Sequence, residues 1–206
     1  GVQTCALPIL RTKPQGAQVI HQAIQFVVTE LNTYLNLRSP SLTADRAVLD
    51  SLFDTSGNLN ADAKEKVVLS VVNVQEDPVY HSVEVYEKRP DGGAEMVRPE
   101  VRVNLFLLFI ANFSEYDESL KALEHVISFF QTRHVFNYSS IPALSQQARR
   151  MVFELYSMTF QQQTHPWGAL GGKYQPSVMY KVGLVAIRDR QLEAEVRPVE
   201  QILINE

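Results

Sequence analysis

The chain of 206 residues has little of several features that would restrict its function. It has one cysteine, which excludes an internal disulfide framework and a zinc site built from several cysteines. Its formal net charge of -4 gives no basic surface of the kind that nucleic-acid-binding proteins use. No apolar run approaches the roughly 20 residues of a membrane span. We therefore expect a protein that folds in the cytoplasm, with no nucleic-acid partner and no membrane insertion.

Motifs for catalysis and ligand binding are also missing. A phosphate-binding loop ending at Lys173 would need glycine at position 167 and serine or threonine at position 174, where the chain has Trp167 and Tyr174. The five histidines form no His-x-x-x-His pair that would ligate zinc. Ser177 lacks the flanking glycines of a nucleophile elbow. We expect no catalytic residue, no cofactor and no metal site.

Glu154 lies within a predicted strand and needs a separate interpretation. Such a charge discourages edge-to-edge pairing of sheets, or it pairs with Lys181 on the next predicted strand. A role as general acid is less favoured, because no second carboxylate accompanies it. Two alternative functions stay open at this point. One is an enzyme with a polar site near Glu154 and His165, and the other is a monomeric adaptor.

Residues 1–9 differ in character from the rest of the chain. They match, in order, one reading frame of a common sequencing-library adapter. We expect this segment, including Cys5, to be adapter-derived and fused to a truncated gene, with the domain occupying residues 10–206. The alternative is a genuine N-terminal extension.

Two segments have the hydrophobic periodicity of amphipathic helices. In residues 15–37, apolar side chains recur at helical spacing between Pro14 and Pro40. In the second segment, residues 116–130, the apolar residues predicted to face the core alternate spacings of four and three. Ser114 or Asp117 is placed to cap the start of this helix. The residues predicted to face the core are Tyr116, Leu120, Leu123, Ile127 and Phe130.

Several other segments read as strands because they are short and rich in branched or aromatic residues. The predicted strands are residues 67–74, 101–111, 151–160 and 177–187, with a short one within 131–137. Residues 101–111 are the most apolar and are expected at the centre of the sheet. Residues 47–53 fit a short strand or a helical turn, and 199–204 fit a short edge element. Residues 76–99 fit a long hairpin arm or a mobile loop, which is either a solvated connection or a limb that contacts a partner.

The stretch 165–182 joins the last two long strands and holds the sole tryptophan. Its glycines permit positive φ angles, and Pro166 and Pro176 stiffen its ends. We predict an ordered loop in which Trp167 packs against its own sheet, while Lys173 and Tyr174 point outward.

This stretch also carries a resemblance. Residues 167–182, Trp-Gly-Ala-Leu-Gly-Gly-Lys-Tyr-Gln-Pro-Ser-Val-Met-Tyr-Lys-Val, resemble the signature of the tail-terminator, or tube-cap, family. That family belongs to phage-tail-like contractile injection systems of the virulence-cassette and antifeeding-prophage type. Further segments, in order, resemble its strands and main helix: residues 67–77, 103–113, 116–131 and 153–156. The resemblance runs from about residue 16 to residue 190; residues 39–66 do not align with it securely.

The resemblance implies a small α+β domain with a mixed or mainly antiparallel sheet and two principal helices packed on one side. It implies a sixfold ring of this chain that ends the inner tube and helps to anchor the sheath, first in the cytoplasm and then in a released particle. Its partners would be further copies, the inner tube protein and the sheath protein. The motif residues taken as a possible interface are Trp167, Gly168, Gly171, Gly172, Lys173, Tyr174, Pro176, Ser177 and Tyr180.

Overall fold

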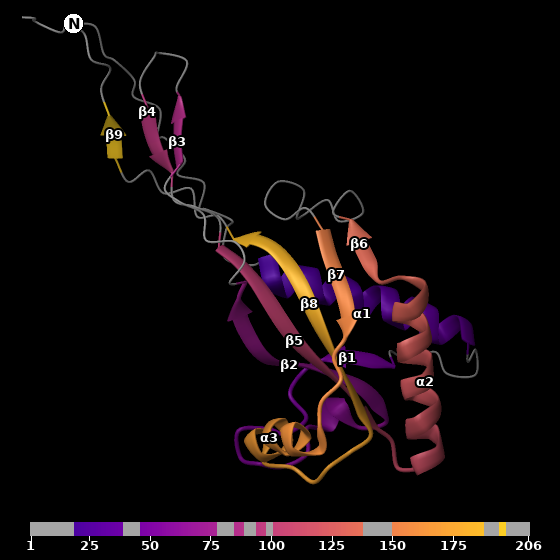
Figure 1. The fold of residues 1–206 in the computed structure, drawn as a ribbon. Helices are drawn as coiled ribbons and strands as arrows, with labels where there is room; N and C mark the ends of the chain where they lie inside the picture. Colours follow the sequence, from indigo (N-terminus) through magenta and orange to yellow (C-terminus); the bar gives the residue numbers. More distant parts are fainter. Residues whose placement is uncertain are drawn as a thin grey trace, which may run out of the picture.

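The computed structural model describes residues 19–38, 46–77, 85–88, 94–97, 101–137, 150–187 and 194–196. These residues form the elements shown in Figure 1. The helices are α1 (Val19–Arg38), the short 3-10 helix η2 (Ala61–Ala63), α2 (Tyr116–Thr132) and α3 (Phe160–Leu170). The strands are β1 (Ala47–Leu49), β2 (Lys66–Glu76), β3 (Val85–Lys88), β4 (Ala94–Val97), β5 (Val101–Asn112), β6 (Val135–Asn137), β7 (Arg150–Leu155), β8 (Ser177–Ile187) and β9 (Ala194–Val196).

Six of the strands form one mixed sheet in the order β1-β2-β5-β8-β7-β6. β1 runs parallel to β2, and the other neighbouring strands are antiparallel. The most apolar segment, β5, lies inside the sheet, as its sequence predicts. Its side chains are apolar at consecutive positions because both faces of the sheet are covered at this strand.

Helices α1 and α2 cover one face of the six-stranded sheet, which we call the α1–α2 face (Figure 1). Its core is rich in aromatic rings. Phe130 of α2 is the centre of this cluster, with ring centroids 4.5 Å from Phe153, 4.6 Å from Tyr180 and 5.2 Å from Phe109. The helix thus contacts β5, β7 and β8 through one side chain.

Helix α3 covers part of the opposite face, which we call the α3 face (Figure 1). A smaller buried cluster lies there and consists of Leu52, Ala63, Val68, Phe106, Leu108, Ile110, Trp167 and Met179. The predicted α+β class with a mixed sheet is confirmed. The two principal helices, α1 and α2, pack on one face as expected. The linker before β8 adds a third helix, which was not expected, on the second face.

The rotation of α2 differs from the sequence prediction. Tyr116 is 67% exposed, and Leu120 and Ile127 are exposed as well, although all three were expected in the core. The buried positions of α2 are Ser119, Ala122, Val126, Phe129 and Phe130. Two consecutive phenylalanines at the end of the helix are both buried, and this fixes a rotation in which small residues lie against the sheet. The apolar side chains of α2 cover a wider part of the helix surface than the part that contacts the sheet. The sequence alone therefore could not distinguish the two rotations.

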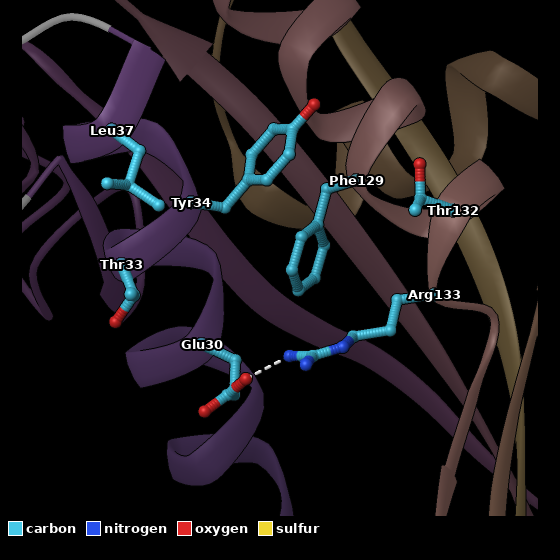
Figure 2. Close-up of a pocket in the computed structure, with 7 residues that line it drawn as sticks. All are labelled: Glu30, Thr33, Tyr34, Leu37, Phe129, Thr132 and Arg133. Atoms are coloured by element: carbon cyan, nitrogen blue, oxygen red, sulfur yellow. Dashed lines mark hydrogen bonds and ion pairs between the residues drawn. The ribbon is translucent and has the colours of Figure 1, made fainter.

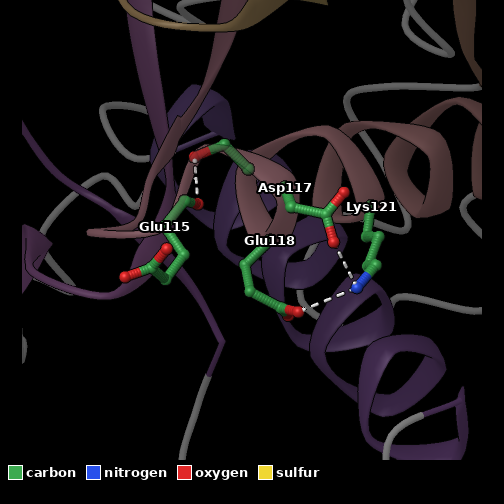
Figure 3. A network of polar contacts seen from close by, with 5 residues as sticks. Glu115, Asp117, Glu118 and Lys121 are labelled. Carbon is green, nitrogen blue, oxygen red and sulfur yellow. Dashed lines mark hydrogen bonds and ion pairs between the residues drawn. The ribbon is translucent and has the colours of Figure 1, made fainter.

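The start of α2 is also stabilised differently from the prediction. Neither Ser114 nor Asp117 caps it; Glu115 occupies the N-cap position without a side-chain cap. The backbone N–H and hydroxyl of Ser114 instead donate to the carboxylate of Glu65. The ammonium group of Lys121 forms ion pairs with the carboxylates of Asp117 at 2.6 Å and Glu118 at 3.1 Å (Figure 3). The hydrogen bond to Asp117, followed by that to Glu118, raises the pKa of the Lys121 ammonium group.

For residues 47–53 the sequence allowed a short strand or a helical turn, and residues 47–49 form the strand β1. The side chain of Asn32 in α1 holds this strand at the sheet edge. Its amide oxygen accepts from the backbone N–H groups of Arg46 at 2.8 Å and Ala47 at 2.7 Å. Its amide nitrogen donates to the Ala47 carbonyl at 2.8 Å. A buried polar side chain therefore occupies the backbone groups that an edge strand would otherwise expose.

The predicted arm contains an antiparallel hairpin of β3 and β4, and β9 adds to it as a third strand. Figure 1 shows this small sheet at the end of the molecule opposite α3. Whether it contacts a partner stays a prediction. Residues 1–9 and 199–204 lie outside the described residues. In the described part of the chain, no helix combines the length and apolarity needed to cross a membrane.

Candidate interaction surface on the α3 face

Helix α3 has clear start and stop signals. Thr159 and Gln162 form a capping box: Gln162 N–H donates to Thr159 Oγ1 at 3.3 Å, and Thr159 N–H donates to Gln162 Oε1 at 3.0 Å. The helix ends at Gly171, whose φ of 69° is left-handed. The predicted loop is therefore wrong for residues 165–170, and the predicted strand 151–160 ends at Leu155. Pro166 inside the helix obscured these signals.

Trp167 packs on its own sheet, as expected. Its side chain is 5% exposed, and its ring lies 5.6 Å from the ring of Tyr174. Its indole Nε1 is buried without a hydrogen-bond partner in the described part of the chain. Gly172 lies against Phe53, whose ring comes within 2.2 Å of the position that a Cβ would take. These contacts fix the turn after α3.

Two residues of this turn point to solvent, as expected. Lys173 is exposed. Tyr174 is 61% exposed, and its hydroxyl accepts a hydrogen bond from Gln163 Nε2 at 3.3 Å. Gly168 lies in α3, and a side chain at its position would meet open space. The outward part of the predicted motif is therefore small.

The rest of the motif belongs to β8 and its start. The Pro176 carbonyl accepts from Ala111 N–H at 2.9 Å, and the Ser177 hydroxyl is buried. Tyr180 faces the opposite side of the sheet, where its ring lies 5.7 Å from Phe109. Burial raises the pKa of Tyr180 to about 12. Its position makes Tyr180 a core residue of the α1–α2 face in this chain.

A groove of about 580 Å³ lies between α3 and the adjoining part of the sheet. It is largely apolar and has several amide side chains. Its described lining consists of Val72, Asn73, Gln75, Phe106, Tyr156, Met158, Gln162, His165, Pro166, Ala169 and Met179. His165 is the sole His, Asp, Glu, Lys or Arg side chain of this described lining. The groove therefore suits uncharged side chains better than an ionic ligand.

Exposed apolar side chains adjoin this groove and were not singled out from the sequence. Phe160, the first residue of α3, is 92% exposed. Leu155 and Tyr156 at the end of β7 are also exposed, and the Tyr156 ring lies 5.2 Å from Phe106. Contiguous exposed apolar surface commonly marks a contact with another protein. In the sequence these residues read as the continuation of a strand, which hid their exposure.

A second, smaller groove of about 270 Å³ lies between α1 and α2. Figure 2 shows Glu30 of α1 and Arg133, just beyond α2, forming an ion pair there. Tyr34 and Phe129 pack at 5.3 Å on its apolar side, and the Arg38 guanidinium lies 5.1 Å from the Tyr34 ring centroid. The Glu30–Arg133 ion pair and the Tyr34–Phe129 contact connect α1 to the C-terminal end of α2.

The residues considered for catalysis do not form one site. Glu154 is exposed on β7 and is not part of the described lining of the groove that His165 lines. In register, Glu154 lies opposite Lys181 of β8, as the pairing interpretation requires. The described residues contain no group of three or more His, Cys, Asp or Glu placed to hold a metal ion.

Comparison with known proteins assigns the family. A model of the Pvc16 N-terminal domain matches residues 22–201. The chain belongs to the Pvc16 N-terminal domain family. The resemblance to tail-terminator proteins of contractile injection systems is thereby confirmed. A search among curated proteins finds no match.

Two solved structures share the fold of this Pvc16 N-terminal domain. One is the tube-terminating cap of the anti-feeding prophage, and the other is the sheath/tube terminator, in the extended state, of an extracellular contractile injection system called PVC. Each aligns with a TM-score of 0.53 and 15% identity over 87% of this chain. The chain spans 60% of the first protein and 62% of the second, so about three fifths of their length.

Proposed function

We propose that this chain forms part of a cap that ends the inner tube and helps to anchor the sheath of a contractile injection particle. The observation that carries the proposal is the family match over residues 22–201, together with the fold shared with two terminator structures. The role is structural, with no catalytic step and no cofactor. The described residues favour this over an enzyme, because the candidate acid and histidine do not share a groove.

The cap acts as a ring of several copies, six in number if it follows the symmetry that the resemblance implies. A ring that sits on a stack needs one surface that contacts the last tube ring and another that refuses a further ring. Head-to-tail contacts between identical subunits close into a ring when the rotation between them permits. The partners are further copies of this chain, the inner tube protein and the sheath protein. Assembly takes place in the cytoplasm before the particle is released.

The α3 face supplies the contact surface that the structure supports best. Lys173 and Tyr174 point outward from the turn that follows α3. The exposed Phe160 is the first residue of α3. Aromatic side chains of this kind dominate the energetics of protein interfaces. The small sheet of β3, β4 and β9 is the second candidate contact.

Deletion of the gene from an intact cluster tests the function. Electron microscopy of the particles should show tubes of uncontrolled length or unstable particles. A plasmid copy of the gene should restore the wild-type length distribution, and an empty plasmid should not. Particles of normal length that contract normally in the deletion strain would contradict the proposal.

A further inference from the structure

The outer edge of β2 is longer than the strand that covers it. β2 extends from Lys66 to Glu76, whereas β1 pairs with Val67, Val68 and Leu69. Beyond that point β5 is the sole strand paired with β2 within the described residues. Figure 1 shows the second half of β2 extending past β1. An edge of this kind presents backbone N–H and C=O groups to a further strand.

On its α1–α2 side this edge is apolar, and residues 70–75 carry no charge. Val74 is 50% exposed, and Val71 is also exposed. Both lie opposite core residues of the α1–α2 face in the β5 register. Residues 70–75 contain no lysine or proline, the residues that protect natural edge strands. An exposed edge with this composition is expected to be covered in the assembled protein.

The other side of the same edge opens into the groove of the α3 face. Val72, Asn73 and Gln75 form the wall that β2 contributes, and α3 forms the opposite wall with Pro166 and Ala169. A sheet edge beside a helix is an arrangement that accepts an extended peptide as an added strand. Backbone hydrogen bonds then give affinity, and the groove receives alternate side chains.

We propose that residues 199–205 of a second copy of this chain add as a strand to the β2 edge and supply the contact between neighbouring subunits. The inference rests on the proposed function insofar as it identifies the self-contact of the ring. A strand at this edge meets Val71 and Val74 on one face and the largely apolar groove on the other, so it needs apolar side chains at consecutive positions.

Residues 199–205 have the sequence that this position requires. Outside the described ranges, Ile-Leu-Ile at 202–204 is the one run of three consecutive aliphatic residues. Isoleucine has a high preference for strands. The run from Gln201 to Asn205 carries no charge, which fits a groove whose described lining has one histidine and no acid, lysine or arginine.

The position of β9 favours a second copy over the chain's own edge. β9 ends at Val196, three residues before this segment, and pairs with β4 in the small sheet. Figure 1 shows the arrow of β9 pointing away from the six-stranded sheet. The last described residues before the donor segment therefore belong to a different sheet from the acceptor edge. Contacts of this type are head-to-tail and produce rings or filaments.

Hydrogen exchange on the full chain at increasing protein concentration tests the contact. Those amides of residues 72–75 that point to the open edge should exchange roughly tenfold more slowly in the assembled protein than in the monomer, as newly paired strand amides do. The double change Ile202→Asp and Ile204→Asp should remove both the protection and the assembly. Ala169→Arg, which places a long cation on the groove wall, should do the same.

Two matched variants control for added charge. Leu37→Asp alters an exposed aliphatic residue of α1, and Gln161→Arg alters an exposed residue of α3 that is not part of the described groove lining. Both should keep the protection. Circular dichroism should show native helix content for every variant, because all described positions are exposed.

Mixing the variants tests whether the contact is between copies. The Ile202→Asp/Ile204→Asp protein keeps an intact edge, and the Ala169→Arg protein keeps an intact donor segment. Each should be monomeric alone, and the mixture should form heterodimers and nothing larger by light scattering. A mixture that stays monomeric would overturn the inference.

Three further outcomes would overturn it. They are protection that does not depend on concentration, absence of protection in an assembled wild-type ring, and normal assembly of the Ile202→Asp/Ile204→Asp protein. None of them affects the proposed cap function, which stands or fails on the tube length in the gene-deletion strain. The two ideas therefore fail in different experiments.

Discussion

The two faces of the six-stranded sheet differ in how completely they are covered. On the α1–α2 face, helices of 20 and 17 residues close a continuous core that contains most of the ring-to-ring contacts. On the α3 face, a helix of 11 residues covers a smaller core and leaves a groove beside it. Both faces are built from alternate residues of the same strands. The first face holds the fold together, and the second leaves sheet surface uncovered by the described residues.

The largest effect on stability is expected from Phe130→Ala on the α1–α2 face. The change removes a ring that is 1% exposed and that contacts one aromatic side chain on each of the strands β5, β7 and β8. The free energy of unfolding should fall by about 4–5 kcal/mol, since several rings would line the cavity. Urea titration followed by circular dichroism measures it. A loss below that of Trp167→Ala would break the proposed difference between the faces.

Trp167→Ala on the α3 face should cost less, about 3 kcal/mol, at the lower end for a buried large aromatic residue. The core around Trp167 is smaller, and its indole nitrogen already lacks a hydrogen-bond partner in the described structure. Phe160→Ala is the control on the same helix, because its ring is 92% exposed. Equal midpoints for Trp167→Ala and wild type would show that Trp167 does not hold α3.

The burial of Tyr180 predicts a loss of stability at alkaline pH. Burial raises the pKa of its hydroxyl from 10.0 to about 12, so the folded protein retains this proton when the unfolded chain has lost it. The contribution is fully present below pH 10 and decreases as the pH rises toward 12. Urea midpoints at several pH values should therefore fall more steeply for wild type than for Tyr180→Phe. Parallel pH curves for the two proteins would contradict this.

The smallest effect on stability is expected from Tyr174→Ala. Its side chain is largely exposed, so the free energy of unfolding should change by no more than about 0.5 kcal/mol. Ring or particle assembly should nevertheless weaken, because Tyr174 is on the proposed contact surface. Electron microscopy should be combined with thermal melting, beside Trp167→Ala. A large loss of stability with normal assembly would reverse the assignment of these two aromatics.

The strand pattern was largely predictable from the sequence. Residues 177–187 form β8 with the bounds that were predicted, and residues 101–111 form the interior strand β5 with one residue added. Branched and aromatic residues at consecutive or alternating positions leave few other structures in segments of this length. The first helix was also predicted; its described part is Val19–Arg38, and residues 15–18 lie outside the described residues.

Helix α3 and the rotation of α2 were missed for physical reasons. Pro166 disfavours a helix locally, yet the Thr159–Gln162 capping box, Gly171 and the burial of Trp167 outweigh it. In α2, five apolar residues fitted one stripe, but the adjacent Phe129 and Phe130 turned the helix toward another. The capping box was a readable signal for α3; the rotation of α2 had no comparable local signal.

The sequence by itself determined the strands, the two long helices and the family, because hydrophobic period and motif order are properties of the chain. The tertiary structure decided which side chains become surface. Leu120 and Ile127 are exposed because the rings of neighbouring strands select the buried side of α2. Tyr180 and Trp167, close in sequence, lie on opposite faces because one belongs to a strand and the other to a helix packed across the sheet. Burial depends on contacts between distant segments, and no local pattern contains that information.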